Sequence, residues 1–589
     1  MKAWRGKCLV VDLTRGLIKT ASLPRRLLES FMGGRGLGVK LVYDLAPRRV
    51  DAYHEDNVIV LSTGPLTGTK FYGSHRFAVV SKSPLTGTIF DSSCGGEWGS
   101  QLKAAGLDAL VIRGRAKALS ALIIDEGEAR MVNVEHMAGL STVEAEAQLQ
   151  RDLGREFRVV CIGPAGENLV RMACIRAGEG HVAGRGGLGA VMGSKRVKAI
   201  AVRGSKSLEV HDEEKLRNLC LLAFKRLQSN PITGKALPSL GTSFLLRLIN
   251  EHRMLPAYNY KQPFFEGSHE ISAEIFKSSF YKRRKGCPNC PIACKRLVEV
   301  DGVEGSQPEF ESLWALGPAC GLSSPKELIE LTWLCDKLGL DTISTGATIA
   351  CAMELTELGL LRPGVGWGDS EAMKKLLVDV ANRRELGDLL AEGSRRLAER
   401  LGKPEVSMNV KGLELPAYDP RGVYGQALAY ATSNRGGCHL RAYMVAGEVL
   451  GVPVLLDRRD PVGKAELVAF YENFFAAIDS MVVCKFLALE LDEEVFAEAL
   501  KAATGLPFTK ASLLEIGERI YNLERLFNVE EGFSRVHDTL PERILCSPDA
   551  PPLSDMLKAY YAVRGWSEEG VPSEDKLIEL GLPGERVEV

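Results

Sequence analysis

The chain lacks the features that would place it in a membrane or on a nucleic acid. No apolar run of its 589 residues comes near the roughly 18 residues of a membrane span, and charges soon follow stretches such as 474–478 and 481–483. The first eleven residues have the pattern of a strand and lack the layout of a signal peptide. With 74 basic and 75 acidic side chains the net charge is −1, without the basic excess of a nucleic-acid-binding protein. We therefore expect a cytoplasmic protein with no membrane span and no nucleic-acid partner.

Aromatic residues and histidines are also scarce, whereas glycine and cysteine are not. Aromatics make up 7% of the chain and there are nine histidines, against 60 glycines and 14 cysteines. Excess glycine without a collagen period indicates places where the backbone approaches another backbone or a ligand closely. In a reducing compartment the cysteines do not form disulfides. Most are therefore expected to be small buried residues, and a few to serve another purpose.

The pattern changes from strands to helices near residue 206. Runs of strand-forming residues between turn signals predict strands at 8–11, 58–61, 77–81, 109–113, 121–125, 159–162 and 199–202. Helical spacing then predicts helices at 213–227, 243–251, 325–338, 370–382, 386–401, 465–477, 493–504 and 510–527. The last forty residues have the pattern of a loosely ordered tail. We predict an α+β fold, with a β-rich N-terminal domain over residues 1–205 and two mainly helical domains over 206–410 and 411–589.

Three cysteines stand in a short loop stiffened by prolines. Cys287, Cys290 and Cys294 have the spacing C-x2-C-x3-C, and soft thiolates suit an iron–sulfur cluster or zinc. Structural zinc sites usually pair two cysteine knuckles, and no second knuckle is present. A 4Fe–4S cluster needs a fourth ligand from elsewhere in the chain. The order also differs from the C-x3-C-x2-C of radical enzymes that use S-adenosylmethionine.

An aspartate motif, D-x-x-G-L-D, follows at the end of the helix predicted over 325–338. Gly339 can end that helix in a left-handed cap, and Asp341 can begin the next one as its N-cap. The motif would place a carboxylate beside a helix N-terminus, where it can accept paired N–H donors such as those of a pterin ring. An ordinary helix–turn–helix cap is the alternative interpretation.

Together with the cysteine trio, this motif makes the chain resemble the tungsten-containing aldehyde:ferredoxin oxidoreductase family, from Gly33-Gly34-Arg35-Gly36 to about Glu530. In that family a second motif, D-x-x-G-L-C, supplies the fourth cluster cysteine. Its counterpart here runs from Asp479 to Cys484, with Val482-Val483 in place of Gly-Leu. The resemblance implies four cluster ligands, Cys287, Cys290, Cys294 and Cys484. It implies a pterin held by Asp336, Leu340, Asp341, Asp479 and Val483, with Asp479, at the end of the helix predicted over 465–477, repeating the layout of the first motif.

The resemblance also implies a site for the two phosphates of a bis-pterin cofactor and a bridging Mg²⁺. The glycine-rich run that begins at Ala183 is no dinucleotide fingerprint, because no conventional βαβ unit surrounds it. Ser93 stands where the family often has asparagine, and Arg76, by its residues alone, could be a solvated charge at a strand end. The residues implied near the phosphates are Arg76, Ser93, Gly95, Gly96, Ala183, Gly184, Arg185, Gly186 and Arg441.

Two residues are candidates for catalysis. Glu311 lies in the mostly apolar run 308–317, and burial would raise its pKa into the range that suits proton transfer near neutral pH. By their residues alone, a surface glutamate and a core histidine at His439 are the plainer interpretations. By resemblance, both lie beside the metal. Glu311 would activate water or remove a proton, and His439 would donate a hydrogen bond to the substrate oxygen.

The implied activity is the oxidation of a small aldehyde to a carboxylic acid at a tungsten or molybdenum bis-pyranopterin. Electrons would leave through a 4Fe–4S cluster to ferredoxin or an iron–sulfur partner subunit. The alternatives are a ring-reducing enzyme such as benzoyl-CoA reductase, where a cysteine binds tungsten and Cys320 is a minor candidate, and a zinc-stabilised interaction protein. Some family members hold an interface iron through E-x-x-H. Here Trp333 replaces that histidine, so a homodimer stays open but without this iron.

Overall fold

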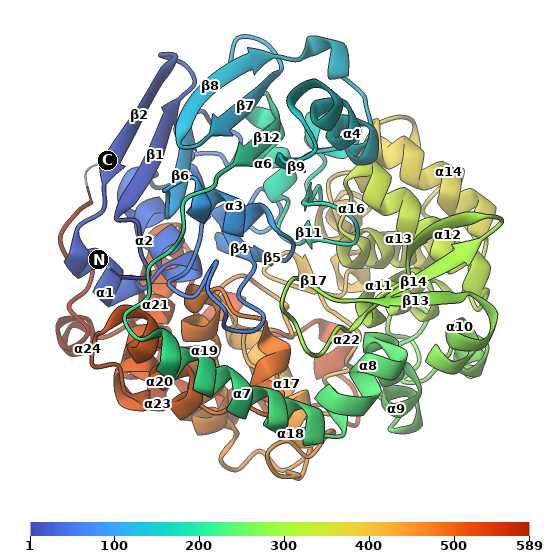
Figure 1. The fold of residues 1–589 in the computed structure, drawn as a ribbon. Coiled ribbons are helices and arrows are strands. Elements are labelled where there is room, and N and C mark those ends of the chain that lie inside the picture. Colours follow the sequence, from blue (N-terminus) through green and yellow to red (C-terminus); the bar gives the residue numbers. More distant parts are fainter. Residues whose placement is uncertain (1, 588–589) are drawn as a thin grey trace.

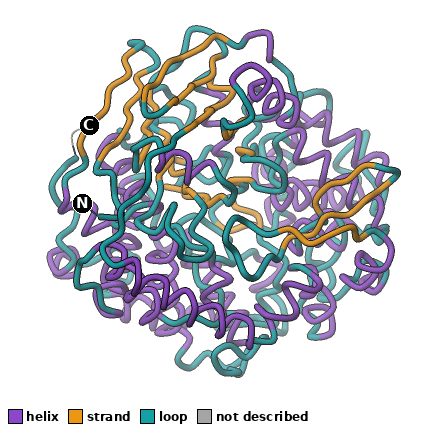
Figure 2. Tube along the Cα trace, in the orientation of Figure 1, coloured by secondary structure: helices purple, strands orange, loops and turns teal. Residues whose placement is uncertain are grey.

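The computed structural model describes residues 2–587, and two six-stranded sheets occupy its N-terminal third (Figures 1 and 2). The first sheet has the order β2-β1-β6-β3-β4-β5, formed by β1 (Lys7–Asp12), β2 (Leu17–Ser22), β3 (Ile59–Ser62), β4 (Phe77–Lys82), β5 (Ile89–Cys94) and β6 (Ala109–Arg113). The second has the order β11-β10-β9-β12-β7-β8, formed by β7 (Ser120–Asp125), β8 (Glu128–Asn133), β9 (Arg158–Cys161), β10 (Ile175–Arg176), β11 (Val182–Ala183) and β12 (Val197–Arg203). The β1–β6 and β7–β12 pairs are parallel.

The two sheets pack face to face, and helices cover their outer faces. Leu9 of β1 and Val202 of β12 belong to the apolar core between the sheets, whereas Val10 points to the helical side of the first sheet. Because both faces of the first sheet are covered, its central strands read as unbroken apolar runs. The helices of this region are α1 (Arg25–Phe31), α2 (Gly34–Leu45), α3 (Trp98–Ala104), α4 (Thr142–Leu153), α5 (Pro164–Glu167) and α6 (Leu188–Ser194).

Helices dominate the rest of the chain, apart from one small sheet and one short hairpin. The sheet is formed by β13 (Tyr281–Lys285), β14 (Lys295–Val300) and β15 (Val303–Ser306), and the hairpin by β16 (Asn409–Val410) and β17 (Leu413–Glu414). The helices up to residue 400 are α7 (Glu213–Ser229), α8 (Leu237–Leu240), α9 (Leu245–Glu251), α10 (Ala273–Ser279), α11 (Phe310–Leu316), α12 (Pro325–Leu338), α13 (Thr342–Glu357), α14 (Ser370–Ala381), α15 (Leu386–Leu390) and α16 (Ser394–Arg400). Those that follow are α17 (Tyr424–Thr432), α18 (Val445–Glu448), α19 (Lys464–Met481), α20 (Glu493–Thr504), α21 (Lys510–Glu530), α22 (Glu542–Leu545), α23 (Leu553–Arg564) and α24 (Glu574–Glu579).

This architecture confirms the α+β prediction, with a β-rich beginning and a helical remainder. The domain boundaries at 205/206 and 410/411 stay predictions. The long helix α19 packs against α2, α17, α21 and α23, and so joins the first sheet to the C-terminal helices. Among the helices described between residues 2 and 587, none has both the length and the apolar character needed to cross a membrane.

Some predicted elements differ from the structure for local reasons. The helix predicted over 386–401 is split into α15 and α16, because Gly393 between them has φ +85°. The helix predicted over 465–477 continues to Met481, where Val482 ends it in the left-handed region. Helix α12 has the predicted bounds. Ser324, with Glu327 three residues later, also has the sequence pattern of an N-cap, but its side chain makes no capping hydrogen bond.

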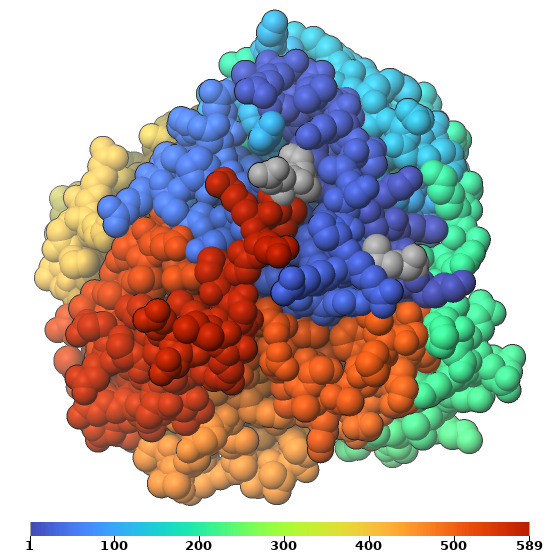
Figure 3. Space-filling view, turned by 90° about the vertical axis from the view of Figure 1, so that its left-hand side faces the viewer, coloured from blue at the N-terminus to red at the C-terminus, as the bar shows by residue number. Residues whose placement is uncertain are grey.

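The prediction of a loosely ordered C-terminal tail is wrong. Helix α23 packs with its Tyr560 fully buried, and the guanidinium of Arg564 pairs with Glu472 of α19 at 2.5 Å. Farther on, the backbone N–H of Val587 donates to Asp44 at 2.8 Å. Figure 3 shows this red C-terminal segment lying across the blue N-terminal part of the surface. Buried anchors spaced along a polar segment therefore hold it in place.

A candidate cofactor cavity and active site

A cavity of about 1200 Å³ lies where all three predicted domains meet. Its wall contains the ends of β5 and α19, the first turn of α11, the start of α13 and the loop between β13 and β14. The structure therefore brings together most of the residues singled out from the sequence. Those in the wall are Arg76, Ser93, Gly95, Gly184, Arg185, Cys287, Cys290, Cys294, Glu311, Asp341, His439, Arg441, Asp479, Val483 and Cys484.

Five predicted residues lie outside that wall. Asp336 and Leu340 line a smaller cavity of about 100 Å³, which shares Lys295 and Asp341 with the larger one. The other three, Gly96, Ala183 and Gly186, follow or precede lining residues and pack against the protein itself. A Cβ on Gly186 would lie 2.5 Å from the ring of Phe90, and Ala183 pairs with Ile175 in the sheet.

The four predicted cluster cysteines share one part of the wall. Three belong to the loop between β13 and β14, and the backbone N–H of Cys484, just after α19, donates to the carbonyl of Gly73 at 3.0 Å. All four are half-buried. Burial raises the pKa of Cys484 to about 11, and the charges of Cys290 and Cys287 add to the rise, so these thiols are near neighbours.

The cysteine group is not arranged for a single metal ion. Across residues 2–587, no three histidine, cysteine or acidic side chains lie close enough together to hold one ion. In an iron–sulfur cluster each thiolate binds a different iron, so its ligands stand farther apart than the ligands of zinc.

The first aspartate motif has the predicted local structure. Gly339 ends α12 with φ +76°, and Asp341 caps α13 by accepting from the backbone N–H groups of Ile343 and Ser344 at 3.1 and 3.3 Å. The Nε of Arg185 lies 3.5 Å from the same carboxylate. A carboxylate and a helix N-terminus therefore meet at one point of the wall.

The second motif repeats the backbone layout of the first, with Cys484 in the place of Asp341. Val482 ends α19 in the left-handed region as Gly339 ends α12, and Cys484 precedes a short 3₁₀ helix as Asp341 precedes α13.

Asp479 stands in the position of Asp336. It lies inside the last turn of α19, because the buried face of that helix runs on to Met481. Its carboxylate is surrounded by cations instead of helix N–H groups. The Nζ of Lys485 lies at 2.7 Å, and Arg35 and Arg441 each approach to 3.5 Å.

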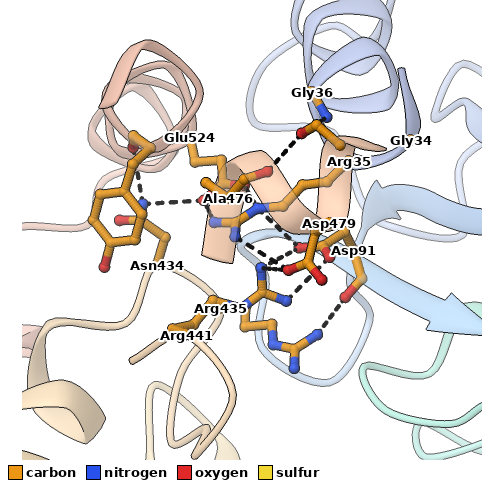
Figure 4. A network of polar contacts seen from close by, with 12 residues as sticks. Gly34, Arg35, Gly36, Asp91, Asn434, Arg435, Arg441, Ala476, Asp479 and Glu524 are labelled. Carbon is orange, nitrogen blue, oxygen red and sulfur yellow. Dashed lines mark hydrogen bonds and ion pairs between the residues drawn. The ribbon is translucent and has the colours of Figure 1, made fainter. Parts of the chain in front are cut away.

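A buried network of charges forms part of the cavity wall and extends behind it, and it joins Arg441 and Asp479 to residues that the sequence did not single out (Figure 4). Arg35 binds Glu524 through two hydrogen bonds of 2.6 and 2.7 Å. Asp91, in the middle of β5, lies 2.9 Å from Arg441 and accepts a hydrogen bond from Arg435 through its backbone carbonyl. Arg35 stands in the glycine run 33–36, which gave a signal, but Asp91 and Arg435 carried none.

The wall also offers hydrogen-bond donors that no protein atom accepts. The buried Nε groups of Arg76, Arg185, Arg435 and Arg441 have no hydrogen-bond partner among the described residues. Leaving a buried donor unsatisfied costs about 1–3 kcal/mol, and more when the group is charged. A ligand with several anionic oxygens, such as the phosphates of a pterin cofactor, would satisfy these groups. The residues present therefore fit such a ligand.

Glu311 and His439 lie next to each other in the cavity wall. One carboxylate oxygen of Glu311 accepts from the N–H of Ala417 at 3.0 Å, and the other lies 3.6 Å from Nε2 of His439. Burial raises the pKa of Glu311 to about 8. Burial, together with Arg185 and Arg435, lowers the pKa of His439 well below its usual value. Near neutral pH the pair is therefore an uncharged imidazole beside a carboxyl group that still holds its proton.

This pair is surrounded by aromatic and sulfur-containing side chains that were not predicted from the sequence. The hydroxyls of Tyr418 and Tyr443 lie 2.9 Å apart, and both rings pack near His439. Cys438 accepts a hydrogen bond from Arg435 at 2.8 Å, and although burial acts to raise its pKa, Arg435 and Arg441 lower it to about 7. Cys320, by contrast, is buried outside the wall, with its thiol 3.3 Å from the carbonyl of Ala315.

One cavity contains neighbouring thiols, arginine N–H groups without a partner and a carboxyl–imidazole pair. This combination defines an oxidoreductase with a metal-containing cofactor. The family models agree. Residues 8–204 match the N-terminal domain of aldehyde ferredoxin oxidoreductase, and residues 219–582 match its domains 2 and 3. The chain belongs to the aldehyde ferredoxin oxidoreductase family.

Individual relatives match over nearly the full chain. The tungsten-containing aldehyde ferredoxin oxidoreductase of Pyrococcus furiosus is 41% identical, with 98% of each chain covered. Its counterpart from Thermococcus kodakarensis is 39% identical over the same shares. Among solved structures, the BamBC active-site complex of benzoyl coenzyme A reductase matches with a TM-score of 0.87 and 26% identity, covering 99% of this chain and 97% of that one.

Proposed function

We propose that this protein oxidises aldehydes to carboxylic acids at a tungsten bis-pterin centre and passes the electrons through a 4Fe–4S cluster to ferredoxin or an iron–sulfur partner subunit. The reaction is RCHO + H₂O → RCOOH + 2 e⁻ + 2 H⁺. One observation carries the proposal: a single cavity wall contains the Glu311–His439 pair, the unpaired arginine donors and all four cysteines. The names of the relatives support tungsten as the metal.

The predicted site residues divide into those that would hold the cofactor and those that would act on the substrate. Asp336, Asp341 and Asp479 would accept N–H donors of the pterins. Arg76, Arg185 and Arg441 would bind the phosphates, with Mg²⁺ bridging them near Ser93 and Ala183. When bound, the tungsten–pterin group accepts the electron pair from the substrate carbon, and the cluster passes the electrons on singly.

Glu311 and His439 would handle the protons. The ionised carboxylate of Glu311 takes a proton from the attacking water, and its unpaired oxygen faces the cavity for that purpose. An uncharged His439 donates its remaining ring N–H to the substrate oxygen and so holds the carbonyl in place. Oε1 of Glu311 and Nδ1 of His439 are buried atoms of the cavity wall, where bulk water and its competing hydrogen bonds are largely excluded.

The ring-reducing alternative is not favoured. The matched chain of the benzoyl coenzyme A reductase complex is 26% identical in sequence to this chain, whereas the tungsten-containing aldehyde enzyme of P. furiosus is 41% identical. Cys320, the minor candidate for a sulfur ligand to tungsten, lies outside the cavity wall. A cytoplasmic location and the three-domain division belong to the proposal as well.

An assay with metal-loaded protein tests the proposed activity. We expect short, long or aromatic aldehydes to reduce a viologen dye, with the matching carboxylic acid as product. Benzoyl-CoA serves as the comparison substrate and should not react under the same conditions. Elemental analysis should find about four iron atoms per chain together with tungsten. Failure of every aldehyde to reduce the dye, in protein with full metal content, would reject the proposal.

The pH dependence of the rate follows from the raised pKa of Glu311. Below about pH 8 its carboxyl keeps the proton and cannot act as a base. We therefore expect kcat/KM to rise with pH through about 8 and then to level off, measured with a dye whose reduction is independent of pH. If kcat/KM instead fell as the pH rose through the same range, Glu311 would be assigned the role of an acid.

A further inference from the structure

The surface beside the cysteine loop has the character of a docking site. We propose that it binds an acidic iron–sulfur protein that takes electrons from the cluster. The docking patch consists of Lys70, Arg217, Leu221, Phe224, Lys225 and Arg284. This inference rests on the proposed function, because the four thiols must hold an electron-carrying cluster for the patch to serve it.

An apolar stripe on α7 forms the centre of the patch. Leu221 is 55% exposed and Phe224 44% exposed, although both are large apolar side chains. With Arg217 and Gln228 they stand at spacings of three and four residues, which places them on one face of the helix. The opposite face, with Cys220 and other apolar residues, is buried. Neighbouring exposed apolar side chains are typical of an interaction surface.

Hydrogen bonds place this face of α7 beside the cysteine loop. The amide of Gln228 donates to the carbonyl of Pro291 at 3.4 Å, and the amide of Asn289 donates to the carbonyl of Lys70 at 2.6 Å. At a rise of about 1.5 Å per residue, Phe224 stands roughly 6 Å and Leu221 roughly 10 Å along the helix from Gln228. A protein interface of standard size, about 800 Å² per partner, spans such distances.

Four exposed cations on or beside the stripe have no ion-pair partner among the described residues, while the exposed acidic residues of the same helix, Glu213 and Glu214, stand in its first turn. Arg217, Lys225 and Arg284 are exposed, as is Lys70, and within residues 2–587 none of the four takes part in an ion pair. On the same strand as Arg284, by contrast, Lys282 pairs with a glutamate at 2.8 Å. Because the whole chain has a net charge of −1, this local excess does not reflect its composition.

Charge also decides which kind of partner fits. A second copy of this chain would bring the same unpaired cations face to face in a symmetric contact, which is unfavourable. An acidic partner is attracted by these cations, and the attraction also raises the rate at which the two proteins meet. Figure 1 shows α7 along the lower edge of the molecule and β13, which leads into the cysteine loop, on its right-hand side.

Charge reversal and loss of the apolar stripe test the patch in the complete holoenzyme. With an acidic two-cluster ferredoxin as acceptor, we expect Arg284→Glu and Phe224→Ser each to raise the KM for ferredoxin at least about tenfold. Aldehyde-dependent reduction of benzyl viologen, which needs no docking surface, should stay as in the wild type. The KM for ferredoxin should rise with salt in the wild type, and less steeply in Arg284→Glu.

Matched controls lie on the edge strand β8, far from the cysteine loop in sequence. Arg130→Glu reverses an exposed charge, and Val132→Ser removes an apolar side chain that is 37% exposed. Both should leave the KM for ferredoxin unchanged. The proposal is overturned if the patch variants behave like these controls, or if they change the oligomeric state instead. Direct binding of ferredoxin to the holoprotein keeps this test separate from the aldehyde assay, because it needs no turnover.

Discussion

Glu311→Gln is expected to lower kcat/KM for aldehyde oxidation by about 10²–10⁴-fold. The amide keeps the size of the side chain and can still contact Ala417, but it cannot take a proton at any pH of the assay. The metal content should stay unchanged, because Glu311 is proposed to act on the substrate and not to hold the cofactor. The measurement is steady-state dye reduction per tungsten, across the pH range in which the wild-type rate rises.

A matched control is Glu330→Gln on α12. Its carboxylate pairs with Lys374 at 2.7 Å and lies outside the cavity wall, so activity should remain near that of the wild type. If Glu311→Gln kept more than about a tenth of the wild-type activity, the proton-transfer role of Glu311 would be contradicted. A variant that lost its metal would point to a structural role instead.

Cys484→Ala is expected to abolish assembly of the cluster. The thiol is the fourth one in the cysteine part of the wall, and alanine leaves one iron without its protein ligand. We expect the iron content to fall well below about four atoms per chain, the visible absorbance of the cluster to disappear, and aldehyde-dependent dye reduction to be lost with them. Far-UV circular dichroism shows whether the chain still folds.

The exposed Cys546 provides the control for this variant. Cys546→Ala removes a thiol outside the cavity wall and should leave the iron content and the rate unchanged. Full iron occupancy in Cys484→Ala would show that a different residue completes the cluster. The proposal for the second aspartate–cysteine motif would then fail, while the cysteine trio would still stand.

Local features of the fold were predictable because their causes lie within a few residues. Pro325 at the first turn and Gly339 just beyond the last set both ends of α12, and the structure has the same bounds. Asp341 was identifiable as an N-cap from its place after that glycine. The end of α19 was misjudged, since the depth to which Asp479 and its neighbours are buried depends on α2 and α21, not on nearby sequence.

The same difference between local and long-range causes decides which residues of the candidate site could be predicted. The spacing of the cysteine trio indicated a metal centre directly, but Cys484 lies nearly two hundred residues later and entered only through a resemblance. The tail was misjudged for a related reason. The C-terminal segment is mostly polar, so its sequence did not indicate that a few residues, such as Tyr560 and Arg564, are buried against α19 and anchor the segment.

The amino-acid sequence by itself determined the ends of helices with clear local signals, such as α12, the loop that carries three thiols and the order of strands followed by helices. These depend on backbone preferences that act over one or two turns. Only the tertiary structure decided that the carboxyl group of Glu311 has a raised pKa, that Asp479 is surrounded by cations and that four arginines with buried, unpartnered Nε groups line a common cavity. The local sequence around a glutamate in the first turn of a helix does not differ between a side chain exposed to water and one buried in a core. The chemistry of such a glutamate is set by side chains that packing brings from distant parts of the chain.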